Sequence, residues 1–509
     1  MDDLTQLILS YRYYIEIFAV VAAVITVISS LDDIFVDVYY WCLRVFGNRN
    51  EVERERTLDF GMLDHAQERP FAIMVPTWKE HAVIFSMLGV SSRLLRYSNH
   101  QYFIGVYQND PQTLEEVRRA QAHFPNIHIV MVPRNGPTSK ADCLNEVISA
   151  IFRYELEHNV TFTGIALHDA EDLIHPHELK LFNYLIPTYD FVQLPVFSFN
   201  LPLRSFVAGT YMDEFAETHS KDLIVREHMS GVVPCAGVSA CFSRRSLAIL
   251  IENNHGEAFD TSSFTEDYDV AFRLAEIGLK TTFVSYPVEY TIDMDSSSDT
   301  PIFLPKTRPI ATREFFPSEL KAAYQQRARW ILGIVFQGMA SHGWGGSLGT
   351  KFFLMRDRKG ILTATTVMLA YFVLANFVAI EIYFRYFQDG EFYRYQLLND
   401  PLVIKLFILN FFFLVWRLVH RMYFTTKVYD LRHGFMAAPR LIVSNFINFF
   451  ASVRAVRIYV WHRVSGKKLV WDKTAHSYPF KLDPVAPFAF KAPPEPTIRP
   501  QSGRRAANR

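Results

Sequence analysis

Polar side chains follow four successive apolar runs in the first third of this sequence. The runs are FAIMVP, YFIGVY, IHIVMVP and FTGIAL, and each has the length and composition of a buried strand. Carboxylates and amides can hydrogen-bond a base and its ribose, and a lysine at a helix start can take phosphate charge. In chain order, the residues at the ends of these runs and just after them are Pro76, Thr77 and Glu80, then Asp110, then Lys140 and Asn145, and last Asp169, Glu171 and Asp172. Together they suit a nucleotide diphosphate.

The last of these segments, His168-Asp169-Ala170-Glu171-Asp172, is an acidic turn. Carboxylate oxygens are the usual ligands of hard cations. We therefore expect Asp169, Glu171 and Asp172 to hold Mg²⁺ or Mn²⁺, with His168 as a weaker partner. Any one of these acids, taken alone, is better explained as a surface turn residue. The recurrence of such turns after successive strands favours a shared site.

The apolar runs alternate with segments that have helical character, among them TLEEVRRAQAHF and KADCLNEVISAIFRYELE. Alternation of this kind predicts a parallel α/β sheet. Ligands of such sheets bind at the carboxyl ends of the strands, where these polar residues fall. The sequence therefore predicts one cleft lined by all of them.

The motifs and their order resemble those of the family 2 inverting glycosyltransferases, whose nucleotide-diphospho-sugar domain has the GT-A fold. The similarity covers most of residues 70–335. It rests on Pro76-x-x-x-Glu80, Lys140-x-x-x-x-Asn145, Asp169-Ala-Glu171, Gln193-x-Pro195, Thr265-Glu266-Asp267 and Gln326-x-x-Arg329-Trp330. Glu171 stands where the family has a second aspartate, which leaves either Glu171 or Asp172 as the main metal ligand. The resemblance implies an α/β GT-A (nucleotide-diphospho-sugar transferase) domain inserted between transmembrane α-helices.

The same resemblance implies roles for individual side chains. Asp267 is the expected base that deprotonates the acceptor hydroxyl, with Glu266 beside it. Both acids begin an amphipathic helix, and a helix N-terminus favours the carboxylate form that a base needs. Helix capping at Thr265 is the structural alternative. The residues expected to bind nucleotide and donor sugar are Pro76, Thr77, Glu80, Asp110, Lys140, Asn145, Asp169, Gln193, Gln326, Arg329 and Trp330.

Three apolar runs, residues 15–31, 361–384 and 402–419, have the length of a helix that crosses a bilayer. Basic residues follow the first run, precede the second and follow the third. By the positive-inside rule the N-terminus lies outside, and the catalytic domain lies on the cytoplasmic side of a bacterial inner membrane.

A fourth apolar run, residues 441–461, carries two asparagines and two arginines that would be costly at the centre of a bilayer. An in-plane amphipathic helix therefore fits this run better than a fourth span. We expect an N-terminal transmembrane helix (1–40), the GT-A domain (60–335), an interfacial segment (336–360), two transmembrane helices (361–420), a cytoplasmic or interfacial amphipathic region (421–482) and a Pro-rich tail (483–509).

Charge and cysteine usage exclude other classes of protein. Lys+Arg and Asp+Glu number 52 each, so no basic field marks a nucleic-acid partner. The four cysteines show neither zinc-site spacing nor a disulfide framework.

Within the family, the segments PTWKE, HDAED and FTEDYD are most similar to the enterobacterial phage-adsorption protein B group. This similarity implies transfer of a sugar such as an N-acetylhexosamine from a UDP-sugar to a growing exopolysaccharide, a role in phage adsorption and an outer-membrane partner protein. It also implies activation by cyclic di-GMP through a further C-terminal domain. We do not expect that control here, because only a Pro-rich tail follows residue 483. Two alternatives stay open: transfer to a lipid phosphate acceptor, and a non-enzymatic membrane scaffold or receptor.

Overall fold

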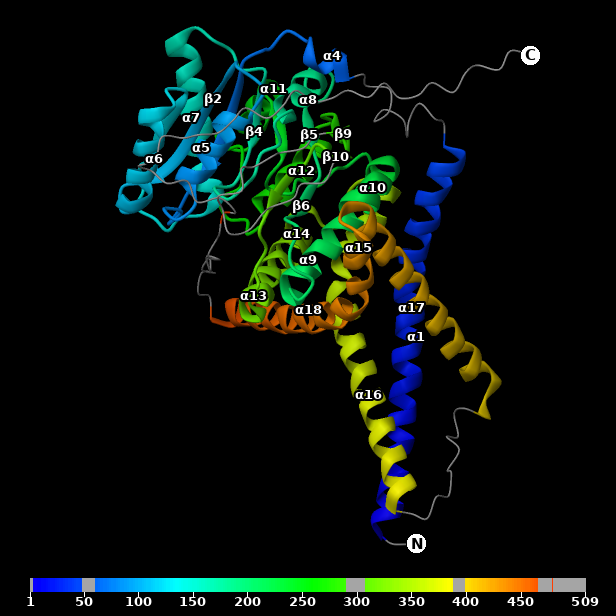
Figure 1. The fold of residues 1–509 in the computed structure, drawn as a ribbon. Helices are drawn as coiled ribbons and strands as arrows, with labels where there is room; N and C mark the ends of the chain where they lie inside the picture. The colour runs from blue at the N-terminus through cyan, green and yellow to red at the C-terminus, as the bar shows by residue number, and fades with distance from the viewer. Residues whose placement is uncertain (1–2, 48–59, 290–306, 388–398, 466–477, 479–509) are drawn as a thin grey trace, which may run out of the picture.

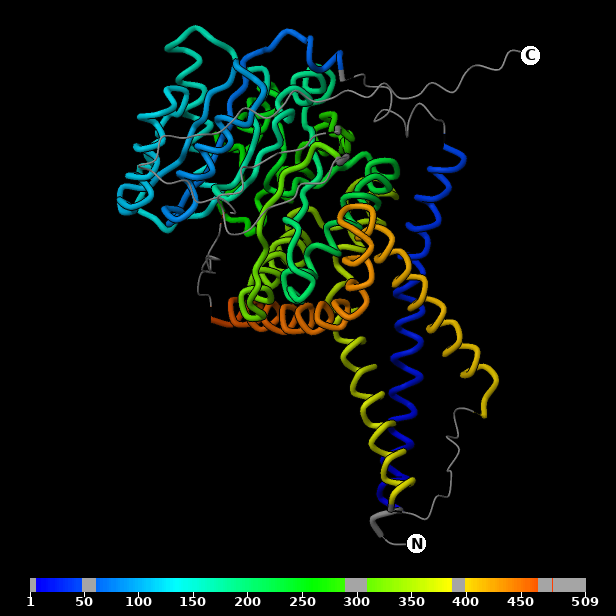
Figure 2. The backbone as a smooth tube through the Cα atoms, in the orientation of Figure 1, coloured from blue at the N-terminus to red at the C-terminus, as the bar shows by residue number. Residues whose placement is uncertain are grey.

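A computed structural model describes residues 3–47, 60–289, 307–387, 399–465 and 478. An α/β domain occupies one end of the molecule, and the long helices α1 (Asp3–Phe46) and α16 (Gly360–Phe387) run away from it in contact with each other (Figure 1). The tube in Figure 2 shows that α1 comes from the N-terminal end, whereas the other long helices come from the C-terminal third. The α/β domain is therefore inserted between apolar helices, as predicted.

Seven strands form the main sheet in the order β3-β2-β1-β4-β7-β5-β8. The first four strands of the chain, β1 to β4, are parallel to one another, which confirms the predicted arrangement. Strand β7 is antiparallel to both of its neighbours, so the sheet is mixed. The strands are β1 (Phe71–Pro76), β2 (His100–Tyr107), β3 (Ile127–Val132), β4 (Gly164–Leu167), β5 (Phe191–Gln193), β7 (Ala240–Ser243) and β8 (Thr281–Phe283).

Two small sheets accompany the main one. Strand β6 (Val196–Ser198) pairs with β11 (Thr312–Glu314) in parallel, and β9 (Pro287–Glu289) pairs with β10 (Thr307–Pro309) in antiparallel. The β6–β11 pair brings the segment just after β5 next to the segment just before α13.

Helices cover both faces of the main sheet, and the alternation of β1 explains how. Phe71, Ile73 and Val75 belong to one buried cluster, whereas Ala72 and Met74 belong to another, because successive side chains of a strand point to opposite faces. The first cluster includes residues of α5 (Ile84–Leu94), α6 (Pro111–His123) and α8 (Glu178–Leu185). The second includes residues of α7 (Lys140–His158), α11 (Arg244–Asn253) and α12 (Glu266–Glu276).

The remaining short helices lie before the domain, inside it, and between the domain and the membrane helices. They are α4 (Phe60–Asp64), α9 (Phe206–Glu217), the π-helix η1 (Thr218–Asp222), α10 (Leu223–Ser230), α13 (Leu320–Ile331), the π-helix η2 (Leu332–Gln337), α14 (Gly338–His342) and α15 (Leu348–Arg358). The expected interfacial segment 336–360 is thus mostly helical.

Among the described residues, four helices are long and apolar enough to cross a membrane: α1, α16, α17 (Pro401–Val428) and α18 (Leu431–Ser465). The first three contain the predicted runs. Helix α18 contains the fourth run, packs on α9 and α13, and lies across the base of the α/β domain at a steep angle to α1 and α16 (Figure 1). The expected tail 483–509 lies outside the described residues.

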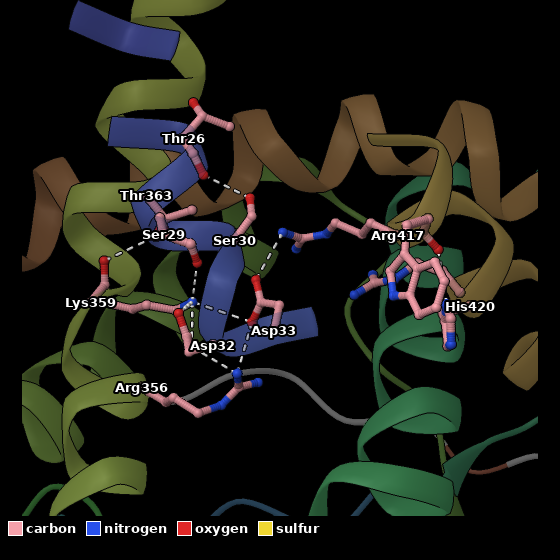
Figure 3. A network of polar contacts seen from close by, with 12 residues as sticks. Thr26, Ser29, Ser30, Asp32, Asp33, Arg356, Lys359, Thr363, Arg417 and His420 are labelled. Atoms are coloured by element: carbon pink, nitrogen blue, oxygen red, sulfur yellow. Dashed lines mark hydrogen bonds and ion pairs between the residues drawn. The ribbon is translucent and has the colours of Figure 1, made fainter. Parts of the chain in front are cut away.

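A network of ion pairs joins α1 to helices more than 300 residues away (Figure 3). Asp32 lies 2.7 Å from both Arg356 Nη1 and Lys359 Nζ, and Asp33 pairs with the same two cations and more distantly with Arg417. The two aspartates that follow the first predicted run are thus neutralised by Arg356 and Lys359, which precede the second run, and by Arg417 near the end of the third. Both sets of charges therefore lie at one level along the helix bundle.

Candidate active site

Lys140 and Asp169 meet at the carboxyl end of the sheet. Lys140 is the first residue of α7, whose N-cap Ser139 accepts a hydrogen bond from the Asp142 amide. Asp169 follows β4, and its Oδ1 lies 2.6 Å from Lys140 Nζ. Burial alone would lower the pKa of Lys140, but the carboxylates of Asp169, Glu266 and Asp267 outweigh it and raise that pKa. The lysine is therefore a fixed positive charge among three acids.

The Thr-Glu-Asp motif lies at the start of α12 and faces this lysine. Asp267 Oδ1 accepts a hydrogen bond of 2.7 Å from the Tyr268 amide. Burial raises the pKa of Asp267 even though the Lys140 ammonium lowers it, and burial followed by the charge of Asp267 raises the pKa of Glu266 to about 8. A carboxylate with a raised pKa is a stronger proton acceptor, which suits a general base.

Gly237 supports Asp267 from behind. Its φ of +80° lies in the left-handed region, and a Cβ at this position would stand 2.6 Å from Asp267 Oδ2. Lys140 Nζ also donates to the Gly237 carbonyl at 3.4 Å. A glycine is therefore required here both by backbone conformation and by the space that the Asp267 carboxylate occupies.

Gln193, which was expected beside the donor sugar, is fully buried and bonds the loop that contains Gly237. Its Nε2 donates to the Val238 carbonyl at 2.9 Å, and its Oε1 accepts from the Ala236 amide at 2.9 Å. Gln193 therefore holds the backbone of residues 236–239 in place, and this backbone forms part of the site.

Asp172 is the predicted metal ligand for which the structure provides another role. Its side chain is fully buried, and its Oδ2 accepts from His168 Nδ1 at 2.9 Å and from the Asp169 amide at 3.0 Å. Burial raises the pKa of Asp172 to about 7 against the opposing effect of His168. This carboxylate points into the core and fixes the acidic turn, because its hydrogen bonds hold the backbone at Asp169.

Several other expected donor-binding residues use their side chains to hold backbone. Asn145 accepts from the Ala258 and Phe259 amides and donates to the Phe259 carbonyl at 2.8 Å. Asp110 accepts from the Lys79 amide and caps α6. Thr77 donates to the Gly105 carbonyl at 2.7 Å.

Glu80 and Pro76 belong to the same rim of the site. Glu80 is 7% exposed, and its amide donates to Thr113 Oγ1 at 2.9 Å. Pro76 ends β1 and pairs with Gly105 of β2. These two residues thus fix the direction in which the chain leaves the first strand.

The Gln-x-x-Arg-Trp motif lies on α13. The buried Oε1 of Gln326 has no hydrogen-bond partner among the described residues. The Trp330 ring lies edge-on to Tyr211, with centroids 6.0 Å apart, and Arg329 is half-buried on the same helix. Trp330 thus packs partly into the aromatic cluster between α13 and α9.

Four structural contacts near the site were not foreseen from the motifs. Gly333 of η2 packs against Thr265, and Gln337 Oε1 accepts from the Phe264 amide at 2.8 Å, so this π-helix holds the loop before Asp267. Arg327 lies 2.6 Å from Glu214 and donates to Asn448 of α18 at 2.7 Å. A polar residue inside an apolar helical stretch, as at Gln337, was the available signal in the sequence.

No group of three or more His, Cys, Asp or Glu side chains is arranged to hold a metal ion within the described ranges. Divalent ions in nucleotide sites usually need only one or two carboxylates, because substrate phosphates and waters complete the shell. Asp169 and Glu171 lie in one turn, and each offers the carboxylate oxygens that a hard cation takes. The chemistry of the residues present therefore fits Mg²⁺ or Mn²⁺.

The family model described as Glycosyltransferase like family 2 matches residues 68–333. The bacteriophage adsorption protein B of Escherichia coli (strain K12) and the bacteriophage N4 adsorption protein B of Escherichia coli O157:H7 are each 41% identical over 482 residues. That alignment covers 94% of this chain and 64% of each relative, so the chain spans less than two thirds of their length.

Two solved structures are also similar. A mannosyltransferase from Pyrobaculum calidifontis, in complex with GDP-Man and Mn²⁺, has a TM-score of 0.44 at 15% identity over 84% of this chain and 99% of its own. The S. aureus TarS fragment 1–349 has a TM-score of 0.31 at 12% identity over 81% of this chain and 100% of its own.

Proposed function

The chain belongs to glycosyltransferase family 2, and from this membership we propose that it transfers a sugar from a UDP-sugar to an acceptor hydroxyl with inversion. The observation that carries the proposal is the arrangement of Asp267 against Lys140 and Asp169. One carboxylate with a raised pKa stands beside a lysine that is itself paired to the acidic turn. The proximity of the proposed base to the proposed phosphate-binding lysine supports the proposal.

In the proposed reaction Asp267 accepts the proton of the acceptor hydroxyl. The acceptor oxygen then bonds to the anomeric carbon while the bond from that carbon to the diphosphate breaks. Lys140 stabilises the departing diphosphate by its charge and its place at the start of α7. Gln326, Arg329 and Trp330 are proposed to line the acceptor side, with Arg329 available to the diphosphate.

We assign the divalent ion to Asp169 and Glu171, and leave Asp172 to hold the turn. When bound, Mg²⁺ or Mn²⁺ supplies Lewis-acid neutralisation of the leaving diphosphate. Asp169 also pairs with Lys140 at 2.6 Å, so the same carboxylate would serve both the lysine and the ion.

We propose that the catalytic domain lies on the cytoplasmic face of the inner membrane and that α18 lies in the membrane plane. Its residues Phe435, Ile442, Phe446 and Phe450 are exposed along one side at helical spacing, whereas Ala437, Ile447 and Ala451 are buried on the other. Helix α13 packs on that buried side. An in-plane helix with one side in lipid would bring the motif of α13 close to the bilayer.

For the acceptor we propose a growing exopolysaccharide and, for the donor, a UDP-N-acetylhexosamine. Transfer to a lipid phosphate is the second candidate, and the contact between α13 and the lipid-facing α18 favours it. Purified full-length protein with Mn²⁺ should release UDP from one member of a UDP-sugar panel, with GDP-mannose included as a competing donor. Radiolabelled product that partitions into the organic phase as a single-sugar lipid would reject the polymer.

Asp267→Asn distinguishes an enzyme from a scaffold, because the amide keeps the shape of the side chain and cannot act as the base. We expect UDP release to fall at least 100-fold. The relatives named for bacteriophage adsorption lead us to propose that the product, with an outer-membrane partner, supports phage adsorption. A deletion strain complemented with Asp267→Asn should then fail to adsorb phage, whereas wild-type adsorption by this variant would favour the scaffold.

A further inference from the structure

His168 is fully buried beneath the acidic turn and is hydrogen-bonded through both ring nitrogens. Nδ1 lies 2.9 Å from Asp172 Oδ2, and Nε2 lies 2.7 Å from Glu178 Oε1. His168 directly follows β4, and Glu178 begins α8. One imidazole thus connects two carboxylates that come from different elements.

The first branch of this network reaches the acidic turn at the proposed leaving-group site. Asp172 Oδ2, which is bonded to His168, also accepts the Asp169 amide at 3.0 Å. Asp169 in turn pairs with Lys140. The position of the Asp169 carboxylate therefore depends on a hydrogen bond that His168 supports.

The second branch reaches the loop behind the proposed base. Glu178 Oε2 lies 3.4 Å from Ser239 Oγ and 3.3 Å from Thr312 Oγ1. Ser239 has a φ of +52° and follows Gly237 by two residues in the loop against which Asp267 rests. Glu178 therefore ties that loop to the same histidine.

We propose that His168 is a positioning residue that holds the acidic turn and the loop behind Asp267 in a fixed relation, acting through Asp172 on one side and Glu178 on the other. The inference rests on the proposed function, because the two ends of the network are its leaving-group site and its base. A buried histidine that only fills the core would affect both ends equally, through stability.

Two substitutions separate the branches. Glutamine places its amide near the position of Nε2 and can keep the bond to Glu178, whereas asparagine places its amide near Nδ1 and can keep the bond to Asp172. His168→Gln should therefore raise the Mn²⁺ dissociation constant about 10- to 100-fold, as loss of a partner behind a metal ligand does. His168→Asn should leave Mn²⁺ affinity near wild type and lower kcat by a similar factor.

Mn²⁺ binding to the full-length protein in detergent is measured by electron paramagnetic resonance without donor, and kcat by UDP release at saturating Mn²⁺ and donor. His219→Gln is the matched control. His219 is also a buried histidine, 5% exposed, and its Nδ1 accepts a hydrogen bond of 3.1 Å from the Val196 amide. This control should lower the melting temperature without changing either readout.

The proposal is supported if His168→Gln weakens Mn²⁺ binding while His168→Asn keeps Mn²⁺ affinity and lowers kcat. The proposal is overturned if the two variants change Mn²⁺ affinity and kcat alike, or if His168→Gln binds Mn²⁺ as the wild type does. The proposed function still stands in either case, provided that the wild-type protein is active. A wild-type protein that binds no Mn²⁺ and releases UDP from no donor overturns the proposed function itself. If His168→Asn does not fold, Ser239→Ala cuts the same branch at the loop and is judged by the same readouts.

Discussion

Replacing Gly237 with alanine would test whether the loop behind Asp267 sets the position of the base. The new Cβ would stand 2.6 Å from Asp267 Oδ2, whereas ordinary van der Waals contact begins at 3.4 Å. The carboxylate or the loop must therefore give way by about 0.8 Å. A misplacement of about 1 Å in a reacting group costs on the order of 100-fold in rate, or about 2.7 kcal/mol of transition-state stabilisation.

The same substitution has a second, separable cost. Gly237 has a φ of +80°, and an L-residue in the left-handed region loses about 1–2 kcal/mol of folding stability. Gly231 offers a matched control, because its φ is +69° and a Cβ there would meet no atom within 4 Å. Gly231→Ala should therefore show the loss of stability without the loss of rate.

The assay compares kcat from UDP release at saturating donor with the melting temperature in detergent for both variants. We expect Gly237→Ala and Gly231→Ala to melt at similarly lowered temperatures, and only Gly237→Ala to lose about 100-fold in kcat. A folded Gly237→Ala that keeps the wild-type kcat would refute the claim that this loop positions Asp267. A loss of rate in Gly231→Ala as large as in Gly237→Ala would show that strain alone explains it.

Three further predictions concern other parts of the molecule. Because burial raises the pKa of Asp267, kcat/KM should fall as pH drops while pH is still above the ordinary aspartate range of about 4; a profile flat down to pH 4 contradicts this. Glu214→Gln should destabilise the protein by about 2 kcal/mol in thermal melts, because Arg327 is buried and loses its 2.6 Å partner; an unchanged melting temperature counts against this. Asp32→Asn should lower the resistance of the detergent-solubilised protein to heat, since two basic partners at 2.7 Å lose their shared carboxylate, and equal resistance would show that Asp33 suffices.

The sequence was a reliable guide to the local elements. Apolar runs with strand composition became β1 to β4 in parallel order, because strand pairing and burial depend on patterns that are visible within a few residues. The apolar helices were equally legible, because bilayer thickness requires long uninterrupted runs. Strand β7 was not predicted, since its antiparallel place between β4 and β5 depends on how the chain returns to the sheet.

The sequence predicted the contacts among the long apolar helices only in part. The acids that end the first apolar run and the bases beside the later runs were visible, but their pairing required α1 to lie against α15, α16 and α17. The contact of Arg327 with Asn448, 121 residues away, could not be predicted from the sequence either. Pairings of this kind depend on distances that only the folded chain defines.

By itself the sequence determined the family motifs, the order of the strands that carry them, and the types of residue that gather at the end of the sheet. Tertiary structure decided which of those polar atoms can face a ligand. Asn145 bonds backbone 113 and 114 residues away, Gln193 bonds a loop 43 and 45 residues away, and Asp172 turns toward His168, whereas Lys140, Asp169 and Asp267 lie close together. The physical reason is that a buried polar atom must find a hydrogen-bond partner. Which partner lies within reach depends on chain segments that are distant in the sequence.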